Sequence, residues 1–494
     1  MATRALPLQA SNRALPNPAL VAALLLCALV LPNPAGYVGA GGDDYHYVEA
    51  ARCIATQGWC APETHWATRW PLVAPMGAAF ALFGDAVRTS MIVPFAYTLM
   101  ATLLFTWLVE RHWGRGAALF GGIAFVGTAS FAKGLLQPNV ETVELAWQLA
   151  AVAAGSLAVA SGKARWALLA GLAFGFAVQS RMTGLAWLPV LVLAMPLLPV
   201  ASRRLILPAL VGAAFPLLLD MVVNAFATGR PLLIFELSAA HTRIASTELP
   251  AGTDLTRSPL LNPAFIGGWA PAMGIAAHWS IQGVVNLLAN PQMGPVLVSV
   301  PVLMLLARRH LSWRTAEVRF ALAAAAYAAV LIYVLAIDPK ARMFLPVAAI
   351  AAALVGRLAW ALWQDGERSI PVGVIAILLL FGAIETAKRY DMTVAGPLAG
   401  QWAREHPGSV AIDAQSHRTL TFDATVRTLP VWPVASRPRL LMLVTDPCDA
   451  SRPGDAWHVA RQADFGPPGD PLVLCEFVSR TNFAPTKLRQ PDTR

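Results

Sequence analysis

Residues 41–75 read GGDDYHYVEAARCIATQGWCAPETHWATRWPLVAP, and the fold and function that we expect are built around this stretch. It is the first long polar segment after an apolar run over residues 18–38. It holds two adjacent carboxylates, Asp43 and Asp44, and several tryptophans. If the apolar run crosses a membrane, the polar stretch begins at the membrane surface, where it is the first candidate for a functional site.

The composition predicts a membrane protein. Of the 494 residues, 56% are hydrophobic and only 13% are charged, whereas soluble domains are about a quarter charged. Such a chain needs the bilayer as part of its solvent, which favours a polytopic α-helical membrane protein. Basic cytoplasmic loops explain the net charge of +9. We find no basic stripe interleaved with aromatic residues, so we expect no nucleic-acid partner.

The apolar runs predict about eleven transmembrane helices, in a bacterial inner membrane with the N-terminus in the cytoplasm. We take residues 18–38 as a retained first span rather than a cleaved leader, and residues 370–386 as the last. The Lys/Arg clusters between spans then fall on one side, apart from Lys340 and Arg342 in a turn between the ninth and tenth spans. An odd number of spans places the C-terminus in the periplasm.

We therefore divide the chain into a transmembrane domain over residues 1–387 and a soluble domain over residues 388–494. In the first, residues 39–88 form an external loop and residues 228–295 a long external segment. Residues 71–84 are apolar but too short to cross, and we expect them to form an interfacial or re-entrant helix. The second part has short β-like runs punctuated by Pro and Gly. It predicts a small periplasmic α/β domain of roughly 100 residues.

The five cysteines suggest two disulfides. Cys53 and Cys60 lie in the first external loop, Cys448 and Cys475 lie in the C-terminal domain, and Cys27 is alone in an apolar run. Two pairs in external segments fit an oxidising compartment. Unpaired buried thiols are the alternative interpretation.

The first loop resembles that of a known family. An acidic pair just past a first membrane span, followed by a Trp-rich run into Arg69 and Pro71, is similar to the first external loop of the GT-C membrane glycosyltransferases that use lipid-phosphate sugars. This superfamily holds the protein O-mannosyltransferases and the lipid A aminoarabinose transferases. The resemblance covers about residues 18–356 and does not extend to the C-terminal domain. It implies transfer of a sugar from a polyprenyl phosphate to an acceptor hydroxyl on the periplasmic face, with inversion.

The resemblance implies that Asp43 or Asp44 is the catalytic base that deprotonates the acceptor. Two adjacent carboxylates repel each other, so we expect the pKa of one of them to rise toward a useful value. Either could also coordinate a divalent metal ion through oxygen, although no cofactor is specified by the sequence. The alternative is that one of them caps a helix over residues 45–56 and has no chemical role.

The turn DPKARMFLP, residues 338–346, is the second informative segment. It resembles the family's basic segment ahead of a Leu-Pro helix start, which implies that Lys340 and Arg342 bind the donor phosphate. External cations at headgroup depth suit a lipid phosphate. Snorkelling of both side chains to anionic lipids is the alternative.

We expect further cations and polar residues to line the cavity that holds the donor. Arg69 and Arg181 are additional candidates for the donor phosphate. Arg181 lies between two half-length apolar runs, and a charge at membrane depth faces a cavity or a partner, so an ion pair with Glu141 is its alternative role. Gln137 stands just before Pro138, where the family often has an acidic residue, and Glu141 follows one turn later. The other candidates for the cavity wall are His46, Arg88, Gln137 and Glu141.

Two other classes remain open. A transporter or flippase for lipid-linked glycans should have paired broken helices near the midplane, and only the break at Gln179–Thr183 resembles one. A non-catalytic assembly factor would keep the fold without donor turnover. The partners that we expect are a polyprenyl-phosphate-linked sugar, a glycan, lipid or protein acceptor, and membrane lipids.

Overall fold

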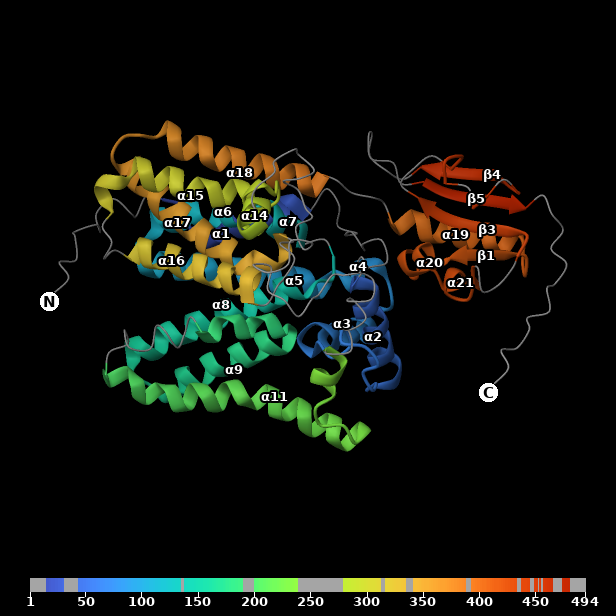
Figure 1. The fold of residues 1–494 in the computed structure, drawn as a ribbon, viewed down its shortest axis with the longest axis horizontal. Coiled ribbons are helices and arrows are strands. Elements are labelled where there is room, and N and C mark those ends of the chain that lie inside the picture. Colours follow the sequence, from blue (N-terminus) through green and yellow to red (C-terminus); the bar gives the residue numbers. More distant parts are fainter. Residues whose placement is uncertain are drawn as a thin grey trace.

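The computed structural model of the chain is mostly helical, with a small sheet unit at the C-terminal end (Figure 1). Helices α2 to α4 lie between the main group of helices and the orange-red sheet unit. The structure describes residues 15–30, 43–134, 137–189, 200–238, 279–311, 316–334, 341–387, 392–432, 437–444, 448–451, 453–454, 456–464 and 473–479.

The first loop forms three helices, α2 (Asp43–Gln57), α3 (Trp70–Phe83) and α4 (Val87–Ser90). Helix α3 has 14 residues, about 21 Å of helix, which is short of the roughly 30 Å hydrocarbon core. It occupies the place where the sequence predicts a short apolar helix. Helix α2 packs its Tyr47 and Val48 face against Leu72 and Met76 of α3, and these four side chains are almost completely buried.

The other helices before the sheet unit form the membrane part of the chain. They are α1 (Pro18–Val30), α5 (Ile92–Trp113), α6 (Arg115–Gly127), α7 (Ala129–Gly134), α8 (Val140–Ser161), α9 (Ala164–Ser180), α11 (Ile206–Thr228), α14 (Trp279–Ala289), α15 (Gly294–Leu306), α16 (Ala316–Ala329), α17 (Leu345–Gln364) and α18 (Ser369–Ala387). Short turns η2 (Met182–Ala186), η4 (Val200–Leu205), η6 (Arg308–His310), η7 (Val330–Val334) and η8 (Ala341–Phe344) join or extend them.

The described residues contain five helices that are long and apolar enough to cross a membrane, or six if the bent pair α14–α15 is one span. The chain is therefore an integral membrane protein, but the predicted number of about eleven spans is not reached among these residues. Helices α1, α3 and α6 are apolar but shorter. The predicted third span, an apolar run over about residues 116–136, is interrupted because α6 ends at Gly127 and Thr128 is extended. The predicted first span continues into residues 31–38, which lie outside the described residues.

Helix α17 is the centre of the membrane part. Fifteen of its residues are buried, and it packs against α6, α15 and α16. A Cβ on Gly356 would lie 2.5 Å from the backbone of Gly121. The two glycines therefore let α6 and α17 approach more closely than any side chain would permit. This close packing places η8, which leads into α17, at one end of the central helix.

The sheet unit follows at the C-terminal end. It contains α19 (Met392–Glu405), β1 (Val410–Asp413), α20 (Ala414–Thr419), α21 (Ala424–Arg427), β2 (Val431–Trp432), β3 (Arg439–Val444), β4 (Trp457–Asp464) and β5 (Val473–Ser479). The strand order is β2-β1-β3-β5-β4. Strand β1 is parallel to β2 and β3, whereas β5 is antiparallel to β3 and β4.

The sheet is apolar on both faces. Leu441 and Leu474 pack with Trp402 of α19 on one face, and Leu440 and Phe477 pack on the other. Consecutive residues of β3 alternate between the two groups because side chains of a strand alternate in direction. The predicted domain boundary at residue 388 falls outside the described residues, and the boundary stays a prediction.

Candidate active site

Arg342 contacts two acidic side chains that come from distant parts of the sequence. It lies in η8, just before α17, and its Nη2 donates a hydrogen bond to Oδ2 of Asp43 in the first turn of α2 over 3.0 Å. Its Nε lies 3.4 Å from Oε1 of Glu141 in the first turn of α8. The structure thus brings together an acidic residue from the first loop and a basic residue from the later turn.

Glu141 lies between two guanidinium groups. Besides Arg342, its Oε1 accepts a hydrogen bond from Nη1 of Arg181 over 2.9 Å. Arg181 stands where α9 ends, because its backbone is extended. The side chain of Glu141 is 6% exposed and that of Arg181 is 12% exposed. The ion pair that was the alternative role of Arg181 is therefore present in the structure, and Glu141 shares its one negative charge between Arg181 and Arg342.

Arg69 adds a third cation to the same region. It immediately precedes α3 and donates from Nη1 to the hydroxyl of Tyr47, and its guanidinium carbon lies 5.5 Å from the centroid of the Tyr47 ring. Burial raises the pKa of the Tyr47 hydroxyl, which therefore stays protonated at neutral pH. Tyr47 follows Asp43 by four residues on α2, so both side chains lie on one face of the helix.

The pKa of Asp43 is lowered, whereas we expected the pKa of one of the two adjacent carboxylates to rise. Burial pushes this pKa upward, but the positive charges of Arg342, Arg69 and Arg181 outweigh that effect and hold it below the usual value. The expected rise therefore does not occur at Asp43. The tertiary structure surrounds this carboxyl with cations that are distant in the sequence. Asp44 is 6% exposed, whereas the side chain of Asp43 is 35% exposed.

The remaining predicted residues have different surroundings. His46 stacks on Trp66, with ring centroids 4.1 Å apart. Gln137 is half-buried just before α8. Arg88 is exposed in α4 and lines a cavity at the junction with the sheet unit. Lys340 lies outside the described residues, and its role stays a prediction.

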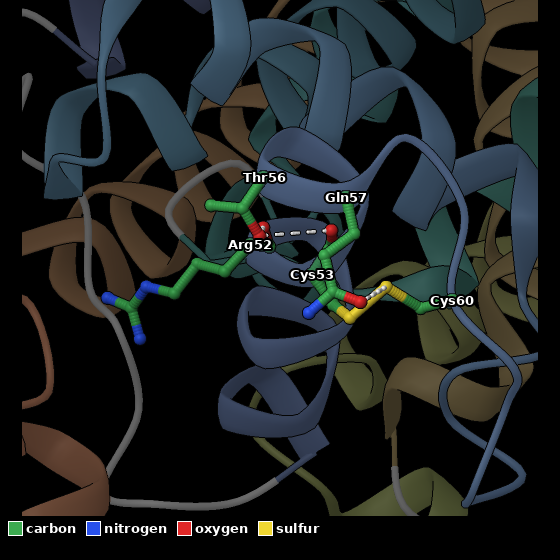
Figure 2. Close-up of a disulfide and its surroundings, with 5 residues drawn as sticks. All are labelled: Arg52, Cys53, Thr56, Gln57 and Cys60. Carbon is green, nitrogen blue, oxygen red and sulfur yellow. Dashed lines mark hydrogen bonds between the residues drawn. A yellow bond between two sulfur atoms is a disulfide. The ribbon is translucent and has the colours of Figure 1, made fainter.

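Both candidate cysteine pairs are bonded in the structure. Cys53 and Cys60 join the last turns of α2 to the following loop, with Cα atoms 6.0 Å apart (Figure 2). Figure 2 shows the side chain of Arg52 leaving α2 away from this bridge. Cys448 and Cys475 connect a turn to β5, with Cα atoms 5.7 Å apart. The first bridge braces the helix that carries Asp43.

The structure adds three further features to the site. The described residues contain no group of three or more His, Cys, Asp or Glu side chains arranged to hold a metal ion. Tyr47 is a partner of Arg69 that the sequence analysis missed, although its four-residue spacing from Asp43 is a helical signal that would have placed it beside the acid. Glu144 is buried one turn after Glu141 and accepts a hydrogen bond from Gln148 over 2.9 Å.

Solved structures similar to this chain are those of membrane proteins. ArnT from Cupriavidus metallidurans matches in its apo state and bound to undecaprenyl phosphate, in each case with a TM-score of 0.40 and 16% sequence identity over 92% of this chain and 97% of ArnT. The arabinosyltransferase EmbB from Mycobacterium smegmatis matches with a TM-score of 0.33 and 16% identity, over 78% of this chain and 42% of EmbB. Both belong to the GT-C membrane glycosyltransferases, the superfamily that the first loop resembles. No protein-family model matches the chain, and no curated protein matches it.

Proposed function

We propose that this chain is a membrane glycosyltransferase that moves a sugar from a polyprenyl-phosphate donor to an acceptor hydroxyl. The observation that carries the proposal is the arrangement of Asp43 and Arg342 in direct contact, with Arg69 and Arg181 close enough to lower the pKa of Asp43. An ionised carboxylate beside several guanidinium groups provides a proton acceptor and a phosphate site in one place.

The guanidinium groups suit the leaving phosphate. Arginine offers planar, paired N–H donors that match phosphate oxygens, and its charge does not depend on pH in the neutral range. The side chain of Arg342 is 35% exposed, so an incoming anion can reach it. Arg181 is more enclosed and is held by Glu141. Arg342 is therefore the primary phosphate ligand, with Arg69 and Lys340 as further proposed ligands.

Asp43 is the proposed base. The acceptor oxygen attacks the anomeric carbon while its proton passes to the Asp43 carboxylate. The bond between the anomeric carbon and the phosphate oxygen breaks, and the polyprenyl phosphate leaves with the electron pair. One displacement of this kind inverts the anomeric centre. Asp43 is preferred over Asp44 because its carboxylate is more exposed and already lies against the cation that would hold the donor.

The experiment is a transfer assay with purified protein, a polyprenyl-phosphate sugar and candidate acceptor lipids or glycans. We expect Asp43→Asn and Arg342→Gln each to lower kcat/KM by about a hundredfold or more. A matched control is Asp365→Asn, because Asp365 also pairs with a cation, Arg309, but lies beyond the other end of α17. Full activity of both site variants would remove these residues from the mechanism.

One observation favours a second candidate, a transporter of lipid-linked glycans. Helices α14 and α15 meet at a bend of 93°, and the buried Asn286 and Asn290 lie at this break. Together with the end of α9 at Arg181, this gives two interrupted helices, as transporters often have. A lipid-flipping assay in proteoliposomes separates the candidates, since movement of labelled lipid without sugar transfer would favour the transporter.

A further inference from the structure

The sheet unit meets the first loop at a cavity of about 280 Å³. One wall comes from the segment between α3 and α5, with Asp85 and Arg88, and the other comes from α19 and the α20–α21 connection, with Gly396 and Phe422. Binding pockets for small ligands typically start near 300 Å³. The cavity lies just below this range, so it has room for a headgroup or a similar fragment but not for a whole lipid.

An ionic latch holds the two walls together. Asp85 Oδ2 accepts hydrogen bonds from Nε of Arg52 and Nη1 of Arg427, each over 2.7 Å. Arg52 also donates to the hydroxyl and the carbonyl oxygen of Thr421, over 2.9 and 3.1 Å. Its guanidinium carbon lies 4.8 Å from the ring centroid of Phe422. We use "latch" for Arg52, Asp85, Thr421 and Arg427, which join α2 and the α3–α4 loop to the sheet unit.

The latch leaves one lining cation without a counter-charge. Asp85 is already bonded to two arginines. Asp423 accepts two backbone N–H groups at the start of α21 and is committed to that cap. Among the described residues, no carboxylate forms an ion pair or hydrogen bond with Arg88, which is exposed. Arg88 is therefore the charged group of the cavity wall that can pair with an incoming anion.

The position of the cavity relative to the membrane suggests where the anion comes from. Arg88 lies in the first turn of the candidate span Val87–Trp113, at the boundary between apolar and polar chain. Leu82 and Phe83 at the nearby end of α3 are 76% and 68% exposed. Such side chains are stable in contact with acyl chains and unfavourable in water. An anion at Arg88 with apolar surface beside it fits a lipid.

We propose that the junction cavity binds the phosphate-bearing headgroup of an anionic membrane lipid, at a site separate from the one formed by Asp43 and Arg342. Arg88 pairs with the phosphate, and the acyl chains lie along Leu82 and Phe83. Because the walls come from the first loop and the sheet unit, the bound headgroup stabilises their docking. The site does not depend on whether the chain transfers sugars.

The test measures lipid binding rather than turnover. Wild-type protein in nanodiscs of phosphatidylcholine is titrated with phosphatidylglycerol, and binding is followed by native mass spectrometry and by thermal unfolding. We expect saturable binding and a higher Tm with phosphatidylglycerol. Arg88→Gln should weaken binding about tenfold or more, the loss expected for a charge-assisted hydrogen bond, whereas Arg88→Lys should keep most of it.

A cavity-filling variant distinguishes a specific site from ordinary contact with the bilayer. A Cβ on Gly396 meets only ordinary contacts, the nearest at 3.7 Å, so Gly396→Met can place a long side chain in the cavity. Its control is Gly373→Met on α18, where a Cβ meets nothing within 4 Å. We expect only Gly396→Met to abolish the saturable binding. Asp365→Asn, which removes an ion pair beyond the other end of α17, should leave it unchanged.

Three results would overturn the proposal. Equal binding of phosphatidylglycerol to wild type and Arg88→Gln would show that Arg88 does not pair with the lipid phosphate. Unchanged binding to Gly396→Met would show that Arg88 contacts only bulk lipid. Inorganic phosphate that binds as well as the lipid and competes with it fully would show a site for the free anion. Each of these outcomes is independent of any loss of transfer activity.

Discussion

Nη2 of Arg342 lies 3.0 Å from Oδ2 of Asp43, although 299 positions separate the two residues in the chain. Arg342 reaches across from the turn before the central helix α17, and Asp43 begins the first helix after the N-terminal apolar helix. Glu141 lies against the other side of the same guanidinium. One cation is therefore shared by two acids, and an anionic substrate can compete with both of them.

Asp43 and Asp44 should differ in their effect on transfer. Asp43→Asn removes the exposed carboxylate and should lower kcat by roughly 10²- to 10⁴-fold, as is typical for loss of a general base. Asp44→Asn should have a smaller effect on kcat, because Asp44 is buried. Steady-state kinetics of both variants test this, with circular dichroism as a folding control. A larger loss of kcat in Asp44→Asn would reverse the assignment.

Removal of Arg342 should move the acid limb of the pH–rate profile. A base must be deprotonated to act, so activity falls as the pH drops through the pKa of Asp43. Among the nearby charges, Arg342 makes the largest contribution to lowering this pKa. Arg342→Gln should therefore raise the pKa and shift the acid limb of kcat/KM to higher pH. Arg342→Lys is the control that keeps the charge, and an identical limb in all three proteins would contradict the base assignment.

Glu141→Gln should change donor binding in the opposite direction to loss of an arginine. In the free protein, the glutamate forms ion pairs with both Arg181 and Arg342. Without its charge, the two guanidiniums repel each other and attract a phosphate more strongly. We expect a lower Tm without ligand, and a Kd for polyprenyl phosphate that is about tenfold lower, equivalent to about 1.4 kcal/mol. Calorimetry at two salt concentrations measures both, and weaker binding would refute this role.

Arg52 should be required for docking of the sheet unit. Its side chain is 10% exposed and that of Asp85 is 25% exposed, and removal of one partner from such a partly buried, charged hydrogen bond costs about 1 to 3 kcal/mol. Arg52→Gln should lower the unfolding free energy and make the sheet unit more sensitive to limited proteolysis. Arg52→Lys should rescue little, because an ammonium cannot match the forked donors of a guanidinium.

A double-mutant cycle tests whether the Arg52–Asp85 contact itself provides this stability. Arg52→Gln and Asp85→Asn should be coupled by about 1 kcal/mol or more. Glu236→Gln is the control, because Glu236 forms an exposed ion pair with Arg230 and should have almost no effect on stability. Additive effects at Arg52 and Asp85 would show that the two side chains act independently.

The two disulfides should contribute unequally to stability. Cys53 and Cys60 close a separation of 7 residues and Cys448 and Cys475 one of 27. The entropy removed from the unfolded chain grows with the logarithm of this separation, which favours the second bridge by roughly 1 kcal/mol. Paired Cys→Ser variants and thermal unfolding measure the difference. A greater loss of stability at the first bridge would show that it matters mainly through the geometry of α2.

The sequence by itself determined the membrane class and the local elements of the first loop. Periodic apolar runs have a length and composition that only a bilayer accommodates, so α5, α8, α11, α17 and α18 could be predicted from their residues. The short α3 could be predicted because 14 apolar residues are too few to cross. The acidic pair and the basic turn were visible as unusual charges next to apolar segments. All of these signals are local in the chain.

Only the tertiary structure decided which charges meet. The contacts of Arg342 with Asp43 and Glu141, and of Arg181 with Glu141, depend on how the helices pack. The lowered pKa of Asp43 follows from those cations and could not be inferred from the neighbouring Asp44. Long-range ion pairs are set by the three-dimensional packing of helices, which a one-dimensional pattern of hydrophobicity does not encode. The latch has the same origin, because Arg52 and Thr421 are separated by 369 residues in the chain.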